Sequence, residues 1–267
     1  MGIVNVTPDS FSDGGLHAST RDALSRCEQL VADGADILDV GGESSRPGAP
    51  PVPLQEELAR LLPVLREAVK LGVPISVDTY KPEAMRAALD QGADIVNDIR
   101  ALRQPGAREA VASHPECGVC LMHMHGDPLT MQRSPMAGDV VPQVLAFLQQ
   151  QTALLLEAGV ARTRIAWDAG IGFGKTVEQN FALLARQREF LADGYPLLAA
   201  WSRKSSLGTV TGLPVDERLA PSIAAALLAV ERGARIVRVH DVKQTAAALK
   251  VWAAATIFPE HETGSPQ

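Results

Sequence analysis

Short apolar runs that each end near a polar residue recur eight times along the chain. The three clearest follow a glycine: GADILD from Gly34, GADIVN from Gly92 and GARIVR from Gly233. A glycine that adopts the left-handed conformation is a common end of a helix. A short run of branched aliphatic residues is typical of a strand buried on both faces. The pattern therefore predicts alternating helices and parallel strands.

The predicted elements follow one another regularly. We expect strands over residues 1–4, 37–40, 75–78, 95–98, 118–122, 165–167, 197–200 and 236–239, with helices over about 19–32, 54–70 and 242–255, one from 82 and one ending near 157. Eight strand–helix units in 267 residues average about 33 residues each, which suits one (β/α)₈ barrel. A doubly wound sheet is the competing architecture.

This spacing predicts an α/β fold, a single TIM barrel over residues 1–258, with a flexible tail over 259–267. Because the first predicted strand begins at residue 1, we expect any segment before it to be missing or shortened. In such barrels the strands end at the face that carries the chemistry, whereas the opposite face contributes stability. The polar residues that follow the strands are therefore the candidate functional residues.

Composition narrows the class of protein. The net charge of −6 and the isoelectric point near 5.5 argue against a general nucleic-acid binder, which usually carries a basic surface. No apolar run approaches the roughly 18 residues of a membrane span, so we expect no membrane association. Three cysteines, an odd number, fit a reduced cytoplasmic protein.

Acidic and amide residues end three of the predicted strands. Asp78, Asn97 and Asp168 follow strands three, four and six, so a barrel would bring them to one pocket floor. Singly, each could cap a helix or lie in a loop. Together, two carboxylates and an amide form a hydrogen-bonding frame for a small planar heterocycle that carries several N–H groups.

Basic residues follow the last two strands. The segment SRKS begins at Ser202, and Arg238 and His240 alternate on one side of the eighth strand. The loops after strands seven and eight are the usual phosphate site of this architecture. Arg238 can grip a phosphate through two N–H donors. A surface ion pair is the alternative for Arg203.

Three other motifs have weaker interpretations. The segment AGIGFGKT, residues 169–176, nearly matches a phosphate-binding P-loop, but Ala169 replaces a required glycine. We expect a loop whose backbone a flat ligand approaches. Cys117 and Cys120 have the spacing of a redox or zinc motif, but no second pair completes a zinc site, so a structural role is favoured. His123 and His125 are rim residues or, less plausibly, metal ligands.

The sequence resembles the dihydropteroate synthase family over nearly its whole length. The family's opening signature stands as GIVNVTPDSFSDGG from Gly2, and its second as DVGGESSRPGA from Asp39. The segments SVDTYKP, NDI, LMHMHG, SRKS and RVHDV follow in the family's order. Ser45 replaces the usual threonine, Ala169 a proline, Ala200 a glycine and His125 a glutamine.

The resemblance implies an activity and a set of roles. The family condenses 6-hydroxymethyl-7,8-dihydropterin pyrophosphate with p-aminobenzoate to give 7,8-dihydropteroate and pyrophosphate. By position, the pterin site comprises Asp78, Asn97, Asp168 and Lys204; the p-aminobenzoate site comprises Ser45, Arg46, Pro47, Phe173, Lys204 and Ser205; the pyrophosphate site comprises Asn5, Arg46, Arg238 and His240; and the catalytic residues are Asp78, Asp168, Lys204, Arg238 and His240.

The resemblance also implies Mg²⁺ bound by Asn5, a cytoplasmic homodimer, and inhibition by sulfonamides, which mimic p-aminobenzoate. Two alternatives remain open from the sequence. A methyltetrahydrofolate-dependent methyl transferase would share the pterin pocket but would not need the SRKS and RVHD anion residues. A non-catalytic pterin-binding homologue would be consistent with Ala169 and Ala200.

Overall fold

Eight parallel strands form the centre of the molecule. The computed structural model describes residues 1–6, 15–44, 46 and 48–257, with the side chains of 15–19 and 257 outside that description. The strands are β1 (Gly2–Asn5), β2 (Leu38–Gly41), β3 (Ile75–Asp78), β4 (Ile95–Asp98), β5 (Gly118–Met122), β6 (Ile165–Asp168), β7 (Leu197–Ala199) and β8 (Ala234–Val237). They pair in sequence order, β1 to β8.

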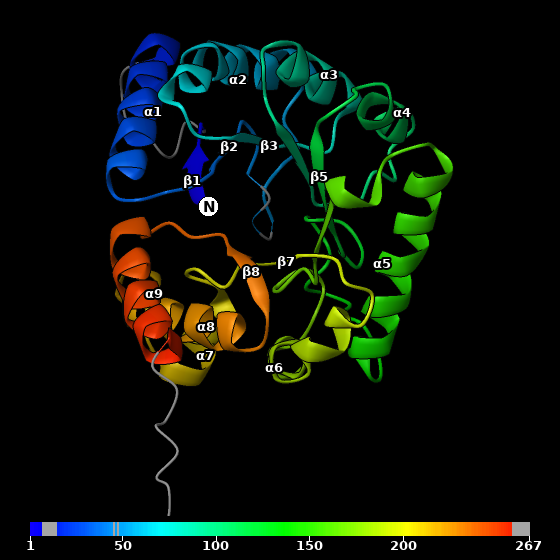
Figure 1. Cartoon of the computed structure of the whole chain (residues 1–267), viewed down its shortest axis with the longest axis vertical. Helices are drawn as coiled ribbons and strands as arrows, with labels where there is room; N and C mark the ends of the chain where they lie inside the picture. Colours follow the sequence, from blue (N-terminus) through cyan, green and yellow to red (C-terminus); the bar gives the residue numbers. More distant parts are fainter. Residues whose placement is uncertain (7–14, 45, 47, 258–267) are drawn as a thin grey trace, which may run out of the picture.

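The last strand returns to the first and closes the barrel. Val239, just beyond β8, accepts a hydrogen bond from the Ile3 N–H and donates its own N–H to the Met1 carbonyl, both at 3.0 Å. A parallel bridge between Gly2 and Val239 marks the same seam. The predicted eight-stranded TIM barrel is therefore confirmed, and the strand ends share one rim (Figure 1).

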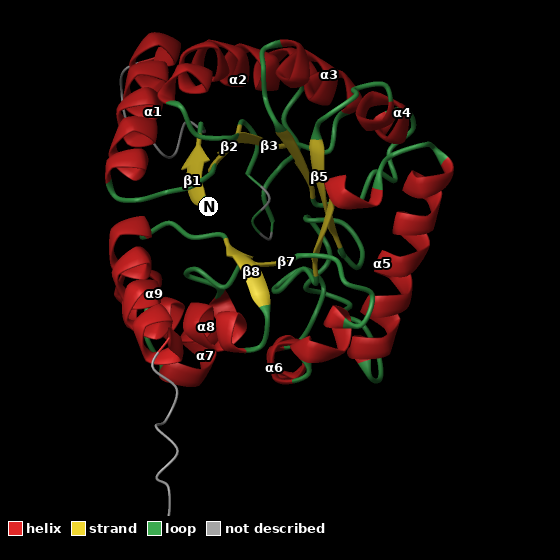
Figure 2. Ribbon diagram, in the orientation of Figure 1, coloured by secondary structure: helices red, strands yellow, loops and turns green. Residues whose placement is uncertain are grey.

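Helices surround the strands (Figure 2). They are α1 (Gly15–Ala32), α2 (Leu54–Ala68), α3 (Pro82–Asp90), α4 (Ala107–Ala112), α5 (Val140–Glu157), α6 (Val177–Ala185), α7 (Ser205–Thr211), α8 (Leu219–Glu231) and α9 (Val242–Ile257), with short 3₁₀ turns η2 (Val69–Leu71), η3 (Arg162–Arg164), η4 (Gln187–Leu191) and η5 (Val215–Glu217). Gly34, Gly92 and Gly233 have φ of 96°, 94° and 95°, as the predicted helix ends require.

Most strand boundaries agree with the prediction, and β8 is the main exception. The structure places β8 at Ala234–Val237, two residues earlier than expected. The pairing of β7 with β8 has a register shift between Leu197 and Leu198. Because of this irregularity, Arg238 and Val239 continue the hydrogen bonding to β7 and β1 from beyond the regular strand.

Alternation along the strands separates two apolar regions. Met1, Cys120, Leu198 and Ala200 are buried together as one cluster, to which Cys120 contributes from β5 as predicted. Trp167 of β6 belongs to the larger cluster that includes residues of the helices, and its indole N–H donates to Thr152 Oγ1 of α5 at 2.8 Å. The next residue, Asp168, therefore emerges on the opposite side, at the rim.

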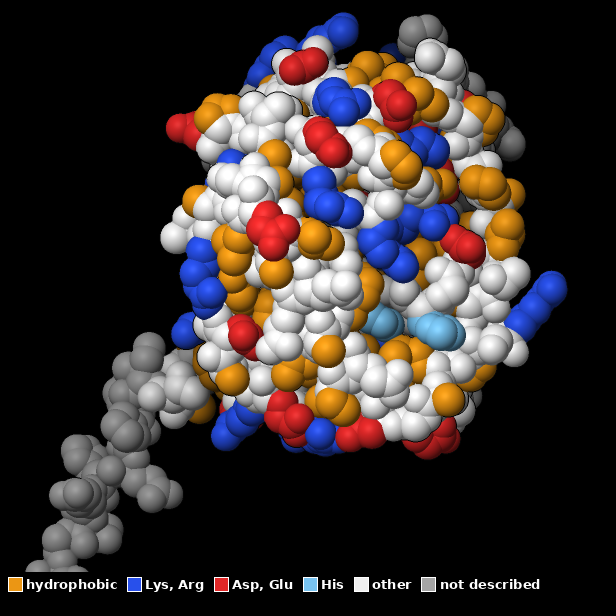
Figure 3. Space-filling view, turned by 90° about the vertical axis from the view of Figure 1, so that its right-hand side faces the viewer, with side chains coloured by type: hydrophobic (Ala, Val, Ile, Leu, Met, Phe, Trp, Pro, Cys, Tyr) orange, Lys and Arg blue, Asp and Glu red, His pale blue; other side chains and the backbone are white. Residues whose placement is uncertain are grey.

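The surface carries mixed charge. On the face that includes α5, Lys and Arg side chains are interspersed with Asp, Glu and apolar ones (Figure 3). Among the described residues, none of the helices has the length and apolarity that crossing a membrane would demand. The proposed tail, residues 259–267, lies outside the described residues.

Candidate active site

Arg238 joins the carboxylates of the rim. Its Nε donates to Asp39 Oδ2 at 2.5 Å and its Nη2 donates to Asp78 Oδ2 at 2.6 Å. Asn97 Nδ2 also donates to Asp39 Oδ2, at 3.2 Å. Strands β2, β3 and β4, together with the residue that follows β8, thus contribute one hydrogen-bonded group, although these residues are far apart in the sequence. The predicted meeting of Asp78, Asn97 and Arg238 is borne out by these contacts.

Burial and mutual charge set the ionisation of this group. Burial raises the pKa of the Asp78 carboxyl, an effect that the adjoining Arg238 guanidinium opposes. Burial alone would lower the pKa of Arg238, but Asp39 and Asp78 raise it above its ordinary value. Two carboxylates around one guanidinium can therefore hold a proton as well as a cation. Such a site can hydrogen-bond a neutral heterocycle or stabilise positive charge on it.

Asp39 was absent from the predicted site. Its side chain is fully buried, and its Oδ1 has no hydrogen-bond partner. It ends the run GADILD, the same pattern that singled out Asp78 and Asn97. The predicted strand continued through Val40, which placed Asp39 inside the strand rather than at its end. Alternation along β2 nevertheless brings Asp39 to the Arg238 guanidinium.

Lys204 and Phe173 adjoin the carboxylates of the site. Lys204 Nζ lies 4.3 Å from the centroid of the Phe173 ring. Burial lowers the pKa of the Lys204 ammonium to about 8, although Asp168 and Asp78 oppose this shift. Asp168 is buried, accepts from the Gly170 N–H at 2.7 Å, and has its pKa raised mainly by burial. An ammonium group, an aromatic ring and a carboxylate therefore converge here, as predicted.

His240 lies at the exit of β8 in a hydrogen-bonded corner. Its Nδ1 lies 2.9 Å from Ser202 Oγ, and its backbone N–H donates to the same oxygen at 3.1 Å. Arg26 of α1 donates to the His240 carbonyl at 2.6 Å. Burial, followed by the charges of Arg203 and Arg238, lowers the pKa of His240 to about 3. The imidazole is therefore neutral near pH 7.

The remaining predicted residues are less closely tied to this group. Asn5 ends β1 opposite Gly41 of β2 and is partly buried. Arg46 is exposed, and its charge contributes to lowering the pKa of His240. Ser205 is exposed at the start of α7. Ser45 and Pro47 lie outside the described residues.

The described residues include no group of three or more His, Cys, Asp or Glu side chains that could hold a metal ion. Asn5 offers one amide oxygen, which is a suitable donor for Mg²⁺. Mg²⁺ usually keeps several waters and binds one or two protein ligands together with substrate phosphates. The amide oxygen of Asn5 would therefore supply only one ligand of such a shell.

Two of the weaker sequence motifs have structural explanations. Cys117 and Cys120 are buried free thiols, and Arg164 Nη2 lies 3.1 Å from Cys117 Sγ. In the near P-loop, Thr176 forms a capping box with Gln179 at the start of α6. These residues contribute to the fold, which is the structural role predicted for the two cysteines.

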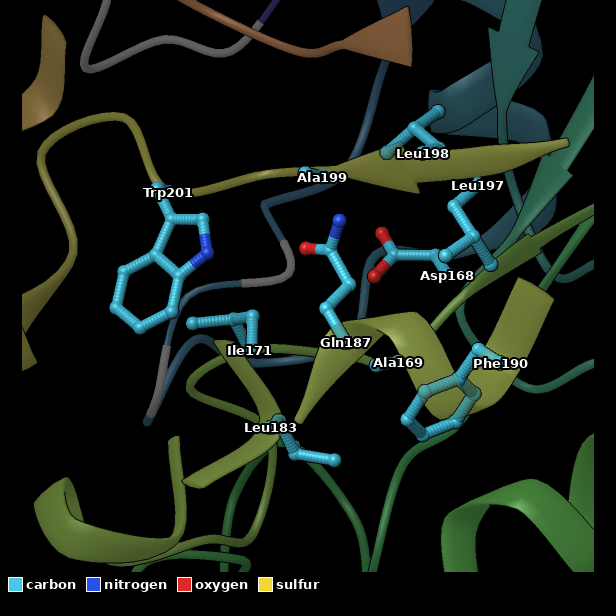
Figure 4. Close-up of a pocket in the computed structure, with 10 residues that line it drawn as sticks. All are labelled: Asp168, Ala169, Ile171, Leu183, Gln187, Phe190, Leu197, Leu198, Ala199 and Trp201. Atoms are coloured by element: carbon cyan, nitrogen blue, oxygen red, sulfur yellow. The ribbon is translucent and has the colours of Figure 1, made fainter. Parts of the chain in front are cut away.

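A small cavity lies beside the site rather than in it. Its lining is mostly apolar and comes from β6, β7, α6, η4 and the loops after β6 and β7, and it includes Leu183, Phe190 and Trp201 (Figure 4). Asp168 contributes the carboxylate at its edge. Since Leu197 and Ala199 of β7 line the cavity and also belong to the core shared with the helices, we interpret it as a packing void.

Fold and site together define a class: a TIM-barrel protein with carboxylates, an amide and basic side chains on the carboxyl rim of its strands. The family model described as pterin binding enzyme matches residues 1–240. The chain therefore belongs to the pterin-binding enzyme family and, by the relatives described next, to the dihydropteroate synthases within it.

The relatives are similar over most of their length. The dihydropteroate synthase of Haemophilus influenzae is 50% identical over 256 residues, which cover 95% of this chain and 92% of that protein. The Xanthomonas albilineans dihydropteroate synthase with 4-aminobenzoic acid has a TM-score of 0.92 and 48% identity, covering 97% of this chain and 93% of that one. The Burkholderia cenocepacia enzyme complexed with 7,8-dihydropteroate has a TM-score of 0.88 and 54% identity, covering 96% and 91%.

Proposed function

We propose that this chain condenses 6-hydroxymethyl-7,8-dihydropterin pyrophosphate with p-aminobenzoate, giving 7,8-dihydropteroate and pyrophosphate. One observation carries the proposal. The Arg238 guanidinium, which can grip a diphosphate, contacts Asp78, which can bind a pterin. The two halves of one substrate would thus meet adjoining side chains. Family membership and identities near 50% give independent support.

The pterin is assigned to the buried acidic side of the rim. Asp78 and Asp168 supply carboxyl oxygens, Asn97 supplies an amide, and Lys204 supplies an N–H donor. Asn97 and Asp168 are buried, and the Asp78 side chain is 11% exposed. Hydrogen bonds from these groups to the pterin ring therefore form with little competition from water. Asp39 supports this side through its bonds to Arg238 and Asn97.

The diphosphate is assigned to Arg238, His240, Arg46 and Asn5. Charged hydrogen bonds from arginine are each worth roughly 1.5–3 kcal/mol. The neutral His240 can still donate one N–H, because the other ring nitrogen faces Ser202. When bound with the diphosphate at Asn5, Mg²⁺ supplies further neutralisation of the phosphate oxygens.

The p-aminobenzoate is assigned to the side that carries Phe173, Lys204 and Ser205, together with loop residues Ser45, Arg46 and Pro47. The Phe173 ring offers an apolar face, and basic residues suit the carboxylate of the ligand. The same pocket would accept sulfonamides, whose arylamine resembles p-aminobenzoate. Competitive inhibition by a sulfonamide against p-aminobenzoate tests this assignment.

The reaction breaks the C–O bond between the pterin methylene and the diphosphate, and the electron pair leaves with the diphosphate. In a dissociative course, positive charge appears on the methylene and delocalises into the pterin ring. Asp78 and Asp168 stabilise that charge, whereas Arg238 and His240 stabilise the leaving group. The arylamine nitrogen then forms the C–N bond and loses a proton.

The test combines binding with product release. Calorimetry with the pterin pyrophosphate, followed by a pyrophosphate-release assay with p-aminobenzoate, should show both binding and turnover. Asp78→Asn should lower kcat by about 10²–10³-fold and change KM by less than about threefold, because it removes charge stabilisation needed in the transition state. The exposed Asp216→Asn is the control and should leave both constants unchanged.

Two results would overturn these assignments. An Asp78→Asn effect confined to KM would contradict the dissociative role of the carboxylate. Binding without pyrophosphate release would contradict the activity and would favour a non-catalytic pterin-binding homologue.

The assembly and location are also part of the proposal. Val210, Leu219, Leu228 and Val251 are exposed apolar side chains on the neighbouring helices α7, α8 and α9, which supports a homodimer through this face. Three buried thiols without disulfides support a reducing compartment, the cytoplasm. Sedimentation analysis of the wild-type protein and of Leu228→Glu tests the dimer, which this variant should weaken.

A further inference from the structure

The lysine of the near P-loop motif is buried beneath its own loop. Lys175 is 2% exposed. Its Nζ donates to the carbonyls of Gly170 at 2.8 Å and Phe173 at 3.1 Å and lies 3.0 Å from His123 Nδ1. An ammonium group has three N–H donors. The three short contacts therefore match its hydrogen-bonding capacity, and all three partners are uncharged.

The loop rests directly on the end of β5. A Cβ atom built at Gly170 would lie 1.8 Å from the His123 carbonyl oxygen, and one at Gly174 would lie 2.3 Å from the His125 carbonyl oxygen. On its other side, the Gly172 N–H donates to Asn180 Oδ1 at 2.8 Å. The loop is thus fixed from above by α6 and from below by Lys175 and β5.

The loop presents one side chain to the site. Phe173 is 7% exposed, and its backbone N–H donates to the Gly170 carbonyl at 3.1 Å, the same carbonyl that Lys175 holds. The ring lies under the Lys204 ammonium, 4.3 Å from Nζ to the centroid. The position of the ring therefore depends on two carbonyls that both bind Lys175.

We propose that Lys175 is a positioning residue for p-aminobenzoate, because its Nζ fixes the Gly170 and Phe173 carbonyls and thereby sets where the Phe173 ring stands. The lysine acts as an internal cation at the centre of the loop. The identity of the substrate in this inference rests on the proposed function.

The direction of the lysine distinguishes this loop from a phosphate-binding one. In a P-loop the lysine reaches outward to the phosphates. Here Nζ bonds inward to the carbonyls of its own loop. The three contacts of Lys175 Nζ can be satisfied whether the lysine is charged or neutral. An ammonium donates to His123 Nδ1, whereas a neutral amine accepts from a protonated Nδ1. The loop therefore keeps its anchor through either arrangement.

The first experiment separates the two substrates. Lys175→Met keeps most of the aliphatic chain and removes every N–H donor. We expect KM for p-aminobenzoate to rise by about tenfold, with KM for the pterin pyrophosphate changed by less than twofold. Asp78 and Asn97 lie on strands to which Lys175 makes none of its hydrogen bonds. Asp168, the pterin residue beside the loop, accepts from the Gly170 N–H and not from Lys175, so its hydrogen bond does not require the lysine. Equal rises in both KM values, or no rise, would overturn the proposal.

A double-mutant cycle tests the route through Phe173. In a Phe173→Ala background, Lys175→Met should raise KM for p-aminobenzoate by less than a further twofold. The same tenfold rise in both backgrounds would show that the lysine acts by another route. Lys70→Met, which removes an exposed lysine paired with Glu67, is the matched control and should change neither KM. If Lys175→Met does not fold, Lys175→Gln takes its place, and we expect a smaller difference between the effects on the two KM values.

Amide hydrogen exchange provides a readout that does not require turnover. Lys175→Met should accelerate exchange in peptides covering 169–176 by at least about tenfold and leave peptides from α5 unchanged. Unchanged exchange in the loop would overturn the proposal whatever the activity. If the wild type releases no pyrophosphate, the proposed function is refuted instead. The exchange result then decides by itself whether Lys175 holds the loop.

Discussion

Two loops on the same rim are held in different ways. The glycine loop after β6 is fixed along its length, because Lys175 fills its underside and its backbone lies on β5. The loop after β2 is held where its two ends meet, at Glu43 and Val52, which we call its neck. There Glu43 accepts from the Val52 N–H at 3.2 Å and from Tyr80 Oη at 2.9 Å. Farther along this loop, Arg46 and Gly48 are exposed.

The neck of the second loop is an ion-pair network. Lys81 Nζ contacts both Glu43 and Glu57, and Glu57 also accepts from Thr79 Oγ1 at 2.6 Å. The Glu57 side chain is only 1% exposed, so the ion pair with Lys81 offsets the cost of burying its carboxylate. One lysine thus binds uncharged carbonyls and the other binds carboxylates. The comparison teaches that contacts to backbone carbonyls can hold a loop along its length, whereas the second loop combines charged contacts at its neck with one backbone hydrogen bond farther out, from the Gly48 N–H to the Pro128 carbonyl at 3.0 Å.

The largest expected difference comes from matched glycines. Gly170 has φ of 69° and Gly48 has φ of 82°, so alanine is strained at both positions. At Gly170 the new Cβ would also meet the His123 carbonyl, whereas at Gly48 it would meet nothing within 4 Å. Gly170→Ala should therefore cost about 4 kcal/mol of unfolding free energy or more. Gly48→Ala should cost roughly 1 kcal/mol.

Urea denaturation of the two variants measures this difference. Equal losses would show that the glycine loop can shift away from β5 and that the comparison between the loops is wrong.

Removing the neck cation should have the next largest effect. Lys81→Met leaves Glu43 and Glu57 facing each other without a counter-ion, and Glu57 cannot reach water. We expect a loss of about 2–3 kcal/mol in unfolding free energy, measured by urea denaturation. Lys70→Met, which breaks an exposed pair, should cost less than about 0.5 kcal/mol. A similar small loss for Lys81→Met would show that the network is not needed.

The contributions of the two lysines to stability should depend differently on pH. Burial lowers the pKa of Lys175 to about 7, so from pH 7 to about 10.5 the unfolded chain binds more protons than the folded one. Burial also opposes the charge of Lys81, but hydrogen bonds to Glu43 and Glu57 raise its pKa above the ordinary value. The contribution of Lys175 to stability should therefore rise with pH over this range, and that of Lys81 should stay constant until about pH 10.5.

Unfolding free energies between pH 7 and 9 check this expectation. The difference between wild type and Lys175→Met should grow by up to about 1.4 kcal/mol per pH unit. The difference for Lys81→Met should stay level. Parallel slopes would contradict the assignment of distinct environments.

The smallest expected change lies at the exposed part of the loop after β2. Arg46→Ala removes an exposed side chain and should alter unfolding free energy by less than about 0.5 kcal/mol. Its effect should appear in the KM values for the pterin pyrophosphate and for p-aminobenzoate, which steady-state kinetics measures. A large loss of stability would show that this part of the loop is as firmly held as its neck.

The fold followed from the sequence because its signals were local. Branched aliphatic runs and helix-ending glycines placed β3, β4 and β5 at their observed bounds. The prediction did not include α4, a helix of six residues that begins after Gly106 without a side-chain cap. It also misplaced β8, because a register shift between neighbouring strands leaves no trace in one strand's own residues.

The meeting of three side chains on one rim followed from the sequence, but their connections did not. Strand ends pointed to Asp78 and Asn97, and alternation along the eighth strand pointed to Arg238. Neither signal indicated that Arg238 bonds to Asp78 or that Asp39 completes the group. Those contacts depend on side-chain reach across the barrel, which a one-dimensional pattern does not contain. In the sequence, Lys175 appeared only as part of a P-loop motif that is incomplete. Its inward hydrogen bonds could not be predicted, because they depend on how the loop folds.

The guanidinium of Arg238 is shared between two acids, and this has a thermodynamic consequence. Any anion that draws this group away changes the proton affinity of Asp78, and any heterocycle that engages Asp78 changes how readily the guanidinium is released. Binding of an anion at Arg238 is therefore linked to binding of a heterocycle at Asp78, by the same factor in both directions.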